Sequence, residues 1–580
     1  MPPTPASVSV HDPAPPHAAE RVEKSTPLAR PDAGPDTRPD TRSDTRQETR
    51  QDSGPDASAA AGGSVSRAAS STGPRAVTPT VLLGGRTPLD CETLERIGAG
   101  RARVAYDPEA RERMERSAAT LAAAAKRGDA IYGLTTGFGP HVRYASASDA
   151  GAHGSGLIAH LASGCGPNCS PEVVRAILAA RCQTLALGRS GIAPRPAEAM
   201  LDLLRSGVLP AIPEIGSVGA SGDLTPLAHC ARVLTGEGVV LAADGGTAPA
   251  GPALREAGLE PIDLPGRDAL ALVNGTAFMT AYAALAIARA QRLFQRCEAL
   301  TAWAFRSLHA RTEAFDARIH EARGHPGQCD SAATVRGLLH DDAVDRSRPL
   351  QEVYSMRCAP QVLGACRDQL AAARATVERE LNGVSDNPVV CGTPHAPAVL
   401  HGGNFQGQHV AFAADAVNAA LTQAGLLMER QLAVVLNPEL NGGAPLLLAW
   451  QPGATSGMAG AQMTATAVAA EMRRSATPSA IATIPTNGLN QDVVSMGAMA
   501  ARVVLEQVER LATILAVHVI ALEQLDYLRA HGRAPGTRVE RPAWAPHIEG
   551  FSADRALRED IARATLAVLE DDAAAAPGAA

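Results

Sequence analysis

The pentapeptide Gly219-Ala220-Ser221-Gly222-Asp223 contains three small residues that could build an electrophile from the chain itself. Its two glycines let the backbone bend back on itself, so we predict a tight turn between helices here. In such a turn the amide nitrogen of Gly222, uncrowded by a side chain, could attack the carbonyl carbon of Ala220. Loss of two waters, one from the ring closure and one from the Ser221 hydroxyl, would leave a methylidene-imidazolone ring, which is a strong electrophile. The simpler interpretation is a glycine-rich loop without chemistry.

A tyrosine stands at the start of a second glycine-rich stretch, residues 132–140. Three glycines and a proline in these nine residues disfavour regular structure and predict a loop that can move. A free tyrosine titrates near pH ~10, so Tyr132 would need a lowered pKa or nearby hydrogen-bond donors to transfer protons at neutral pH. Helix N-termini that converge on the site could supply such a field, because each carries roughly half a positive charge. Without a chemical role, Tyr132 would be a packing residue.

Two further stretches carry polar groups where a site could form. The helical pattern from Asp268 to Leu293 is interrupted by residues 273–276, and such a local conflict tends to mark a working position, so we take Asn274 as a candidate. Tyr354 and Arg357 lie three residues apart further along the chain. A guanidinium can hold a carboxylate through paired hydrogen bonds, although most arginines in helices lie at the surface or in salt bridges.

These stretches, in this order, resemble the aromatic amino acid ammonia-lyases, the family of histidine, phenylalanine and tyrosine ammonia-lyases and their aminomutase relatives. Within this family, the chain resembles the bacterial tyrosine ammonia-lyases in particular. The likeness extends from about residue 80 to about residue 530 and includes two more motifs, Ser385-Asp386-Asn387-Pro388 and His401-Gly402-Gly403-Asn404-Phe405. Each of these alone would be an ordinary turn signal, and their order along the chain makes them specific.

The resemblance implies a role for each of these residues. Ala220, Ser221 and Gly222 would form the family's prosthetic group, 4-methylidene-imidazol-5-one (MIO), and Tyr132 would be the catalytic acid and base on a mobile inner loop. Tyr354 would lie near the substrate amine, and Arg357 and Asn387 would bind the substrate carboxylate. Phe405 would lie beside the prosthetic ring.

The chemistry of ammonia elimination explains why such parts are needed. The amine is a poor leaving group, which a covalent electrophile addresses, and the β-proton is scarcely acidic, which calls for a positioned base. We expect neither a metal nor a nucleotide cofactor. The ten cysteines show no repeated pair spacing, and the nearest pair, Cys165 and Cys169, has no matching second pair to complete a zinc site.

Two positions bear on which amino acid is the substrate. His160-Leu161 resembles tyrosine-using members, where phenylalanine-using plant enzymes carry Phe-Leu and histidine-using enzymes carry Ser-His. An imidazole facing a phenol hydroxyl makes a hydrogen bond that phenylalanine would leave unmade. Gln491 stands where histidine lyases carry Glu, and an amide suits a cationic imidazole substrate less than a carboxylate does. Both positions favour tyrosine, although His160 would otherwise be a satisfied core residue.

The sequence also departs from the family pattern in places that bear on ring preference. Glu352 replaces the Asp of a Gln-Asp pair, and Thr455 replaces the Asn of a Gly-Leu-Asn-Ser-Gly run. Residues 446–448 are three leucines where the family has a Phe-containing stretch.

Composition excludes several other classes of protein. The 580 residues carry a net charge of −7 and no dense basic patch with interleaved aromatics, so nucleic acid is not expected as a partner. We find no apolar run of the roughly 20 residues that a bilayer requires, and take Leu511 to Leu522, with His518 inside it, as the richest segment. The N-terminus lacks the pattern of a secretion signal, so we expect a cytoplasmic protein that does not bind membranes.

The predicted fold is mainly α: a long-helix bundle of the histidine ammonia-lyase type with a smaller mixed N-terminal region. The predicted parts are a disordered tail (1–78), a region with both glycine-rich loops (79–265), a central bundle (266–532) and a C-terminal helix with a frayed end (533–580). The clearest helix runs from Ala498 to Arg529, and the last one is expected to begin at Ser552 as N-cap. The family resemblance implies a homotetramer with shared active sites.

The leading functional hypothesis is non-oxidative deamination of L-tyrosine to trans-4-hydroxycinnamate (p-coumarate) and ammonia, with a small aromatic amino acid as the ligand. A tyrosine 2,3-aminomutase giving β-tyrosine would use the same groups, and a histidine ammonia-lyase is a third possibility. A different class is a catalytically inactive helical scaffold, which would predict decay at the chemical positions. Those positions are intact in this chain.

Overall fold

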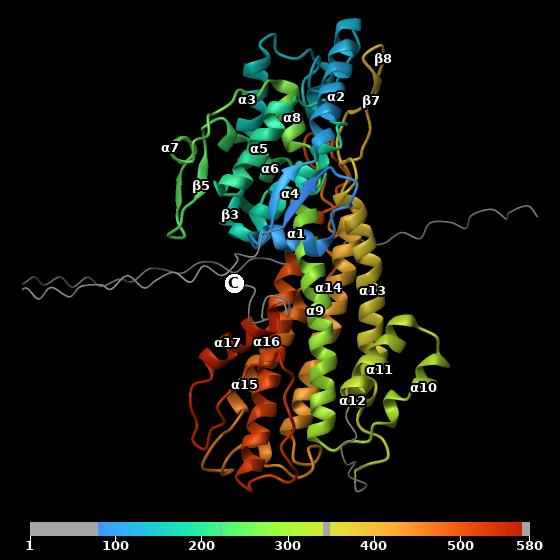
Figure 1. Ribbon diagram of the computed structural model, residues 1–580, viewed down its shortest axis with the longest axis vertical. Coiled ribbons are helices and arrows are strands. Elements are labelled where there is room, and N and C mark those ends of the chain that lie inside the picture. Colours follow the sequence, from blue (N-terminus) through green and yellow to red (C-terminus); the bar gives the residue numbers. More distant parts are fainter. Residues whose placement is uncertain (1–78, 221, 340–347, 571–580) are drawn as a thin grey trace, which may run out of the picture. The chain divides into compact units, whose positions relative to one another are not determined.

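Four long helices form the core of the protein, for which a computed structural model describes residues 79–220, 222–339 and 348–570. The predictions for the tail (1–78), for Ser221 and for the alanine-rich end beyond residue 570 lie outside the described residues. Helix α16 packs along α9 and α14, and α14 packs along α13 (Figure 1). The bounds of these helices are α9 Ala277–Ser307, α13 Ala359–Leu381, α14 Gln408–Leu436 and α16 Gly497–Ala530.

Helices α9 and α16 are apolar on several faces because each is surrounded by other helices. In α16, residues from Leu511 to Leu525 are almost all buried, including the polar His518 and Gln524. A helix that is apolar nearly all round belongs in the interior of a large bundle. The predicted helix Ala498 to Arg529 is therefore confirmed, with one more residue at each end.

Shorter helices and four small two-stranded sheets make up the N-terminal region beside this bundle (Figure 1). The helices are α1 Cys91–Gly98, α2 Pro108–Arg127, α3 Ala150–Leu161, α4 Pro171–Ala186, α5 Pro194–Ser206, α6 Leu224–Leu234, α7 Ala250–Glu256 and α8 Gly266–Val273. The sheet pairs are parallel β1 Thr80–Leu83 with β2 Arg103–Tyr106, and antiparallel β3 Cys165–Asn168 with β4 Pro213–Ile215, β5 Val239–Leu241 with β6 Thr247–Pro249 and β7 Val389–Thr393 with β8 Ala396–Leu400.

The remaining elements flank the bundle along its length. They are η1 Gly139–Arg143, η2 Glu313–Phe315, α10 Ala317–Glu321, α11 Pro326–Leu338, α12 Tyr354–Arg357, η3 Leu446–Leu448, α15 Ala459–Arg474 and α17 Arg558–Leu569.

Local signals account for several boundaries. Helix α2 begins at Pro108 after the N-cap Asp107 and ends at Gly128, whose φ of 92° is the left-handed conformation that glycine accepts most readily. The predicted break in the helix after Asp268 is confirmed, because α8 ends at Val273 and α9 begins at Ala277. The short strands around Val81 and Val104 pair with each other in parallel.

Two expectations about segments were wrong. The last helix begins at Arg558, not after Ser552, because the Asp554 carboxylate accepts the backbone N–H groups of Ser456 and Gly457 instead of those of its own helix. The expectation that no apolar run reaches the length that a bilayer requires was also wrong. Two helical stretches, Gly266–Ser307 and Gln408–Leu436, are long and apolar enough to cross a membrane by length and composition, but their richest windows are 100% and 67% buried in this fold.

Candidate active site

The small-residue loop, residues 217–223, connects β4 to α6, so a short strand precedes the turn that was predicted between helices. The Ser217 hydroxyl donates to the Asp223 carboxylate at 2.7 Å, and the backbone N–H of Gly219 donates to Ser217 Oγ at 3.1 Å. Two further bonds hold its C-terminal side: Gly222 N–H donates to the Phe405 carbonyl at 3.0 Å, and Asp223 N–H donates to the carbonyl of Gly275. The loop is thus closed internally and attached to two distant segments.

Close packing leaves no room for a side chain at Gly222. A Cβ there would lie 2.5 Å from the carbonyl carbon of Gly275, and the φ of Gly222 is +72°. Both observations require glycine. Ala220, two residues earlier, is also buried. The packing therefore requires glycine at the position whose nitrogen the predicted ring would use, and in this structure that nitrogen donates its N–H to the Phe405 carbonyl.

Four helices begin at this loop. Helix α6 starts directly after Asp223, and the Met279 N–H in the first turn of α9 donates to the Asp223 carboxylate at 3.0 Å. Gly407 and Met496, which directly precede α14 and α16, donate their N–H groups to loop carbonyls at 3.2 and 2.9 Å. Helix N-termini carry partial positive charge, so the expected convergence of such ends is found here, around the small-residue loop.

Asp223 connects the loop to this positive field. Its side chain is fully buried, and burial raises the pKa of its carboxyl to about 7, against the opposing effect of the bonds from Met279 and Ser217. A buried carboxylate without hydrogen-bond donors would carry the full cost of desolvation. The bonds from Met279 and Ser217 therefore stabilise the charged form of Asp223. The Asp223 carboxylate thus attaches the loop to the first turn of α9.

A cavity of 780 Å³ lies next to the loop and brings together most of the predicted substrate-binding residues. The predicted residues that line it are Tyr132, His160, Leu161, Asn274, Asn387, Phe405 and Gln491. Phe405 connects this cavity to the small-residue loop, because its carbonyl accepts the Gly222 N–H. The cavity therefore gathers residues from six places between positions 132 and 491 of the sequence.

Tyr132 lies at the edge of this cavity with its hydroxyl turned back into its own loop. The hydroxyl accepts the backbone N–H of Gly139 at 2.7 Å. Burial raises the pKa of Tyr132 above its ordinary value, while the Gly139 donor and the Arg267 guanidinium act in the opposite direction. The expected donor is present, but in the single chain burial outweighs it, so the phenol is the stable form at neutral pH.

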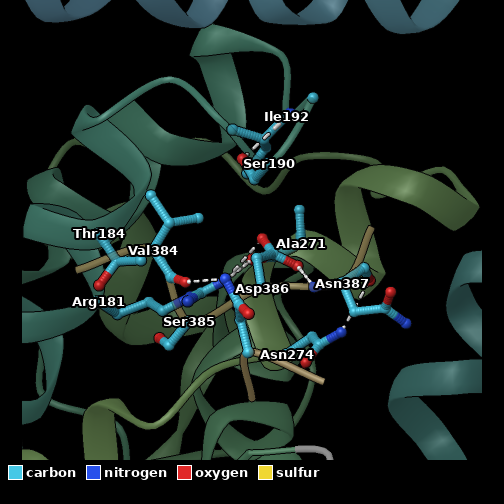
Figure 2. A network of polar contacts seen from close by, with 12 residues as sticks. Arg181, Thr184, Ser190, Ile192, Ala271, Asn274, Val384, Ser385, Asp386 and Asn387 are labelled. Atoms are coloured by element: carbon cyan, nitrogen blue, oxygen red, sulfur yellow. Dashed lines mark hydrogen bonds and ion pairs between the residues drawn. The ribbon is translucent and has the colours of Figure 1, made fainter. Parts of the chain in front are cut away.

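A buried ionic network supports the polar wall of the cavity (Figure 2). The Asp386 carboxylate, 1% exposed, lies 3.5 Å from both Arg181 and Arg267 and accepts the Asn387 N–H at 2.7 Å. Asn274 in turn donates to the Asn387 carbonyl at 2.9 Å. The two asparagines predicted to bind substrate are thus fixed to each other and to a buried charge cluster.

Tyr354 and Arg357 lie elsewhere in the fold, on α12. The side chain of Tyr354 is 73% exposed, and the Arg357 guanidinium lies over its ring, 4.8 Å from the centroid. The adjoining residue Ser355 accepts a bond from Gln431, which also contacts Thr301 near the end of α9. From Ala277 to Thr301 a helix rises about 36 Å at about 1.5 Å per residue. Because Asn274, just before α9, lines the cavity, α12 and the cavity lie near opposite ends of α9. Figure 1 shows α12 at the lower end of the long helices.

Arg357 lines a separate pocket of 220 Å³, whose wall also includes Glu352. Glu352, one of the departures from the family pattern, pairs with the Arg348 guanidinium through two bonds of 2.9 and 2.6 Å. Among the described residues, those that line the 780 Å³ cavity do not include Tyr354 or Arg357. One chain therefore does not bring these two predicted residues to the others.

Two histidines at the cavity were not assigned a role from the sequence. His153 stacks on Phe138 with ring centroids 4.2 Å apart, and His401 accepts the backbone N–H of Tyr132 at 3.1 Å. His153 stands four residues before Leu157 and seven before His160, so helical spacing alone would have placed it on the same face of α3. His401 is the first residue of the His-Gly-Gly-Asn-Phe motif, but its partner is 269 residues away and gave no local signal.

Comparison with known proteins adds to this geometry. The family model described as aromatic amino acid lyase matches residues 89–543. The chain is 41% identical over 497 residues to a tyrosine ammonia-lyase of Cereibacter sphaeroides (82% of this chain, 95% of that enzyme) and 39% identical over 498 residues to a histidine ammonia-lyase of Anaeromyxobacter dehalogenans (83% and 97%). Among solved structures, the tyrosine aminomutase from Streptomyces globisporus matches with a TM-score of 0.78 and 36% identity, covering 84% of this chain and 96% of that chain.

Proposed function

Because the chain belongs to the aromatic amino acid lyase family and is thus a carbon–nitrogen lyase, we propose that it converts L-tyrosine to trans-4-hydroxycinnamate and ammonia. The observation that carries the choice of tyrosine is the state of His160. Its Nδ1 lies 2.9 Å from the Gly156 carbonyl, which can only accept, so Nδ1 carries the proton. In the tautomer with the proton on Nδ1, Nε2 is an acceptor at the wall of the cavity, where a phenol hydroxyl can donate to it.

The prosthetic group of this proposal is the MIO ring formed from Ala220, Ser221 and Gly222. Its formation joins Gly222 N to the Ala220 carbonyl carbon and releases two waters, the second with the Ser221 hydroxyl. The tight backbone at Gly222 and the four helix starts around the loop support this assignment. When formed, the ring supplies an electron-poor carbon that activates the amine for departure.

The chain's own residues position the substrate and move the proton. Tyr132 removes the β-proton, and the Gly139 N–H stabilises the phenolate that must form for this step. Asn274 and Asn387, held by the Asp386 cluster, offer polar groups to the amino acid, while Phe405 and Leu161 enclose its ring. Gln491 at the same cavity is an amide and therefore suits a neutral phenol.

We further propose that Tyr354 and Arg357 of a neighbouring subunit complete the site in a homotetramer. The exposed position of Tyr354 supports this, because a large side chain with 73% exposure next to an arginine is available to another chain. Arg357 would then bind the substrate carboxylate bidentately. The proposal places the enzyme in the cytoplasm and retains the predicted division into tail, loop region, bundle and C-terminal helix.

The test is a product assay with tyrosine, phenylalanine and histidine in parallel. We expect purified protein to release 4-hydroxycinnamate and ammonia from tyrosine with the highest kcat/KM of the three. The same assay tests two alternative functions, an aminomutase and a histidine ammonia-lyase, because relatives of both kinds are similar to this chain. Accumulation of β-tyrosine would replace the lyase proposal by an aminomutase, and fastest turnover of histidine would replace it by a histidine ammonia-lyase.

His160 gives a prediction about selectivity. In His160→Phe the ratio of kcat/KM for tyrosine to that for phenylalanine should fall about ten- to a hundredfold, because the phenol hydroxyl loses its acceptor. The matched control is His395→Phe at the exposed turn between β7 and β8, which should keep the wild-type ratio. An unchanged ratio in His160→Phe would show that another group recognises the hydroxyl.

A further inference from the structure

We propose that His401 is a positioning residue that holds the Tyr132 loop in place at the cavity by accepting the Tyr132 backbone N–H at its neutral Nε2. The inference rests on the proposed function, in which Tyr132 is the base. It adds a component that acts through the backbone of the tyrosine loop (residues 132–146) and does not itself contact the reacting atoms.

The β7–β8 hairpin and Asn387 hold the segment that carries the His401 imidazole. His401 follows β8 directly, and β8 pairs with β7 from Val389↔Leu400 to Thr393↔Ala396. The Gly402 N–H donates to Asn387 Oδ1 at 2.9 Å, which attaches this segment to the Asn387–Asp386 cluster. Both strands also pack against α2. The acceptor is therefore fixed by elements outside the tyrosine loop.

The tyrosine loop is a compact unit that this acceptor can hold at one end. Its two sides are joined by bonds from Gly137 N–H to the Tyr144 carbonyl at 3.0 Å and from Ser146 N–H to the Thr135 carbonyl at 3.1 Å. At its middle, Phe138 stacks on His153 of α3 with an interplanar angle of 13°. The bond to His401 therefore fixes the backbone at the residue that carries the hydroxyl, at the start of a loop whose two sides are joined to each other.

The protonation state of His401 determines whether its Nε2 can accept the Tyr132 N–H. Burial and the nearby Arg267 guanidinium lower the pKa of His401 below its ordinary value of 6.5. Arg267 itself pairs with Asp386, and the other titratable groups that line the same cavity as His401 are Tyr132, His141, His153 and His160. The imidazole is therefore neutral at pH 7, with Nε2 free to accept. Below its pKa it becomes a cation with protons on both nitrogens, and the bond to Tyr132 N–H is lost.

The inference predicts the opening of the loop in His401→Leu. Trypsin cleavage after the exposed Arg143, inside η1, should be about three- to tenfold faster than in the wild type, as expected for the loss of one hydrogen bond. The kcat for tyrosine should fall by a similar factor with a smaller change in KM. His401→Gln, whose amide oxygen can take the place of Nε2, should restore both quantities to near the wild-type values.

The pH profile separates this role from a merely structural one. Cleavage at Arg143, normalised to a free peptide substrate at each pH, should rise in the wild type as the pH falls through the lowered pKa of His401. His401→Gln does not titrate and should lack this rise. His395→Leu, at the exposed tip of the same hairpin, is the control and should behave as the wild type in every measurement.

Three outcomes would overturn the inference. The first is wild-type cleavage and kcat in a folded His401→Leu. The second is an acid-dependent rise that persists unchanged in His401→Gln, which also decides the matter if His401→Leu fails to fold. The third is an equal response in His395→Leu. Cleavage is measured without substrate, so a failure of the tyrosine lyase proposal would appear in the product assay and leave this measurement intact.

Discussion

A Ser221→Ala enzyme is expected to lose tyrosine deamination by at least about 10³-fold in kcat, equivalent to ~4 kcal/mol of transition-state stabilisation. Without the hydroxyl the second water cannot leave, so the ring lacks the electron-poor methylidene carbon that activates the amine. Intact-mass spectrometry checks the cause directly. The wild-type chain should be lighter than its sequence by two waters, and Ser221→Ala should not be.

Two matched variants make this result specific. Gly222→Ala keeps the hydroxyl but adds a Cβ that would lie 2.5 Å from the Gly275 carbonyl carbon, at a φ of +72° that alanine disfavours. It should lose activity and the mass deficit together. Ser552→Ala, at an exposed position, should retain both. A wild-type chain with the full sequence mass and full activity would contradict the assignment of the ring.

The second large effect is expected in Tyr132→Phe, which should lower kcat by about 10²- to 10⁴-fold, the usual contribution of a general base. The aromatic ring and its edge contact with Phe138, at 6.4 Å between centroids, should remain. The mass deficit of two waters should also remain, because the small-residue loop is unchanged. A Tyr132→Phe enzyme with wild-type kcat would assign the proton transfer to another group.

The pH dependence gives the same residue an independent signature. Burial raises the pKa of Tyr132, so the phenolate is a minor species at neutral pH and its share grows as the pH rises toward that pKa. The kcat/KM of the wild type should therefore increase from neutral to alkaline pH. In Tyr132→Phe the residual rate should lack this increase.

Co-expression of two variants with impaired activity checks whether Tyr132 and Arg357 of one active site come from different chains. Tyr132→Phe and Arg357→Ala should each be inactive alone. In mixed oligomers, roughly a quarter of the sites would combine an intact Tyr132 from one chain with an intact Arg357 from another, so part of the activity should return. If both residues of one site came from the same chain, mixing would restore nothing.

Local physics explains which features the sequence could reveal. The end of α2 at Gly128 and the break between α8 and α9 follow from residue types within a few positions, so they could be predicted. The start of the last helix could not. Its expected first turn is held by the backbone of Ser456 and Gly457, about one hundred residues earlier, and such a contact leaves no periodic pattern near Asp554.

The candidate site shows the same division. The candidate residues could be named from the sequence because each stands in a motif with a chemical meaning, and Tyr132, Asn274 and Phe405 are among those that line the cavity. Their arrangement was not found: the bond from Tyr132 to His401 spans 269 residues, and the distance from α12 to the cavity depends on the length of α9. Sequence patterns report which side chains are available, whereas packing over long separations determines which of them meet.

The gathering of four helix starts around one loop has a consequence for synthesis. The Ser495 hydroxyl donates to the Gly219 carbonyl across 276 residues, so a growing polypeptide carries residues 220–222 long before the last segment that holds the loop exists. Until α16 has been made and has docked, the hydrogen bonds from Ser495 and Met496 to the loop are missing. On the proposed assignment of the ring, its formation would therefore be tied to the end of translation.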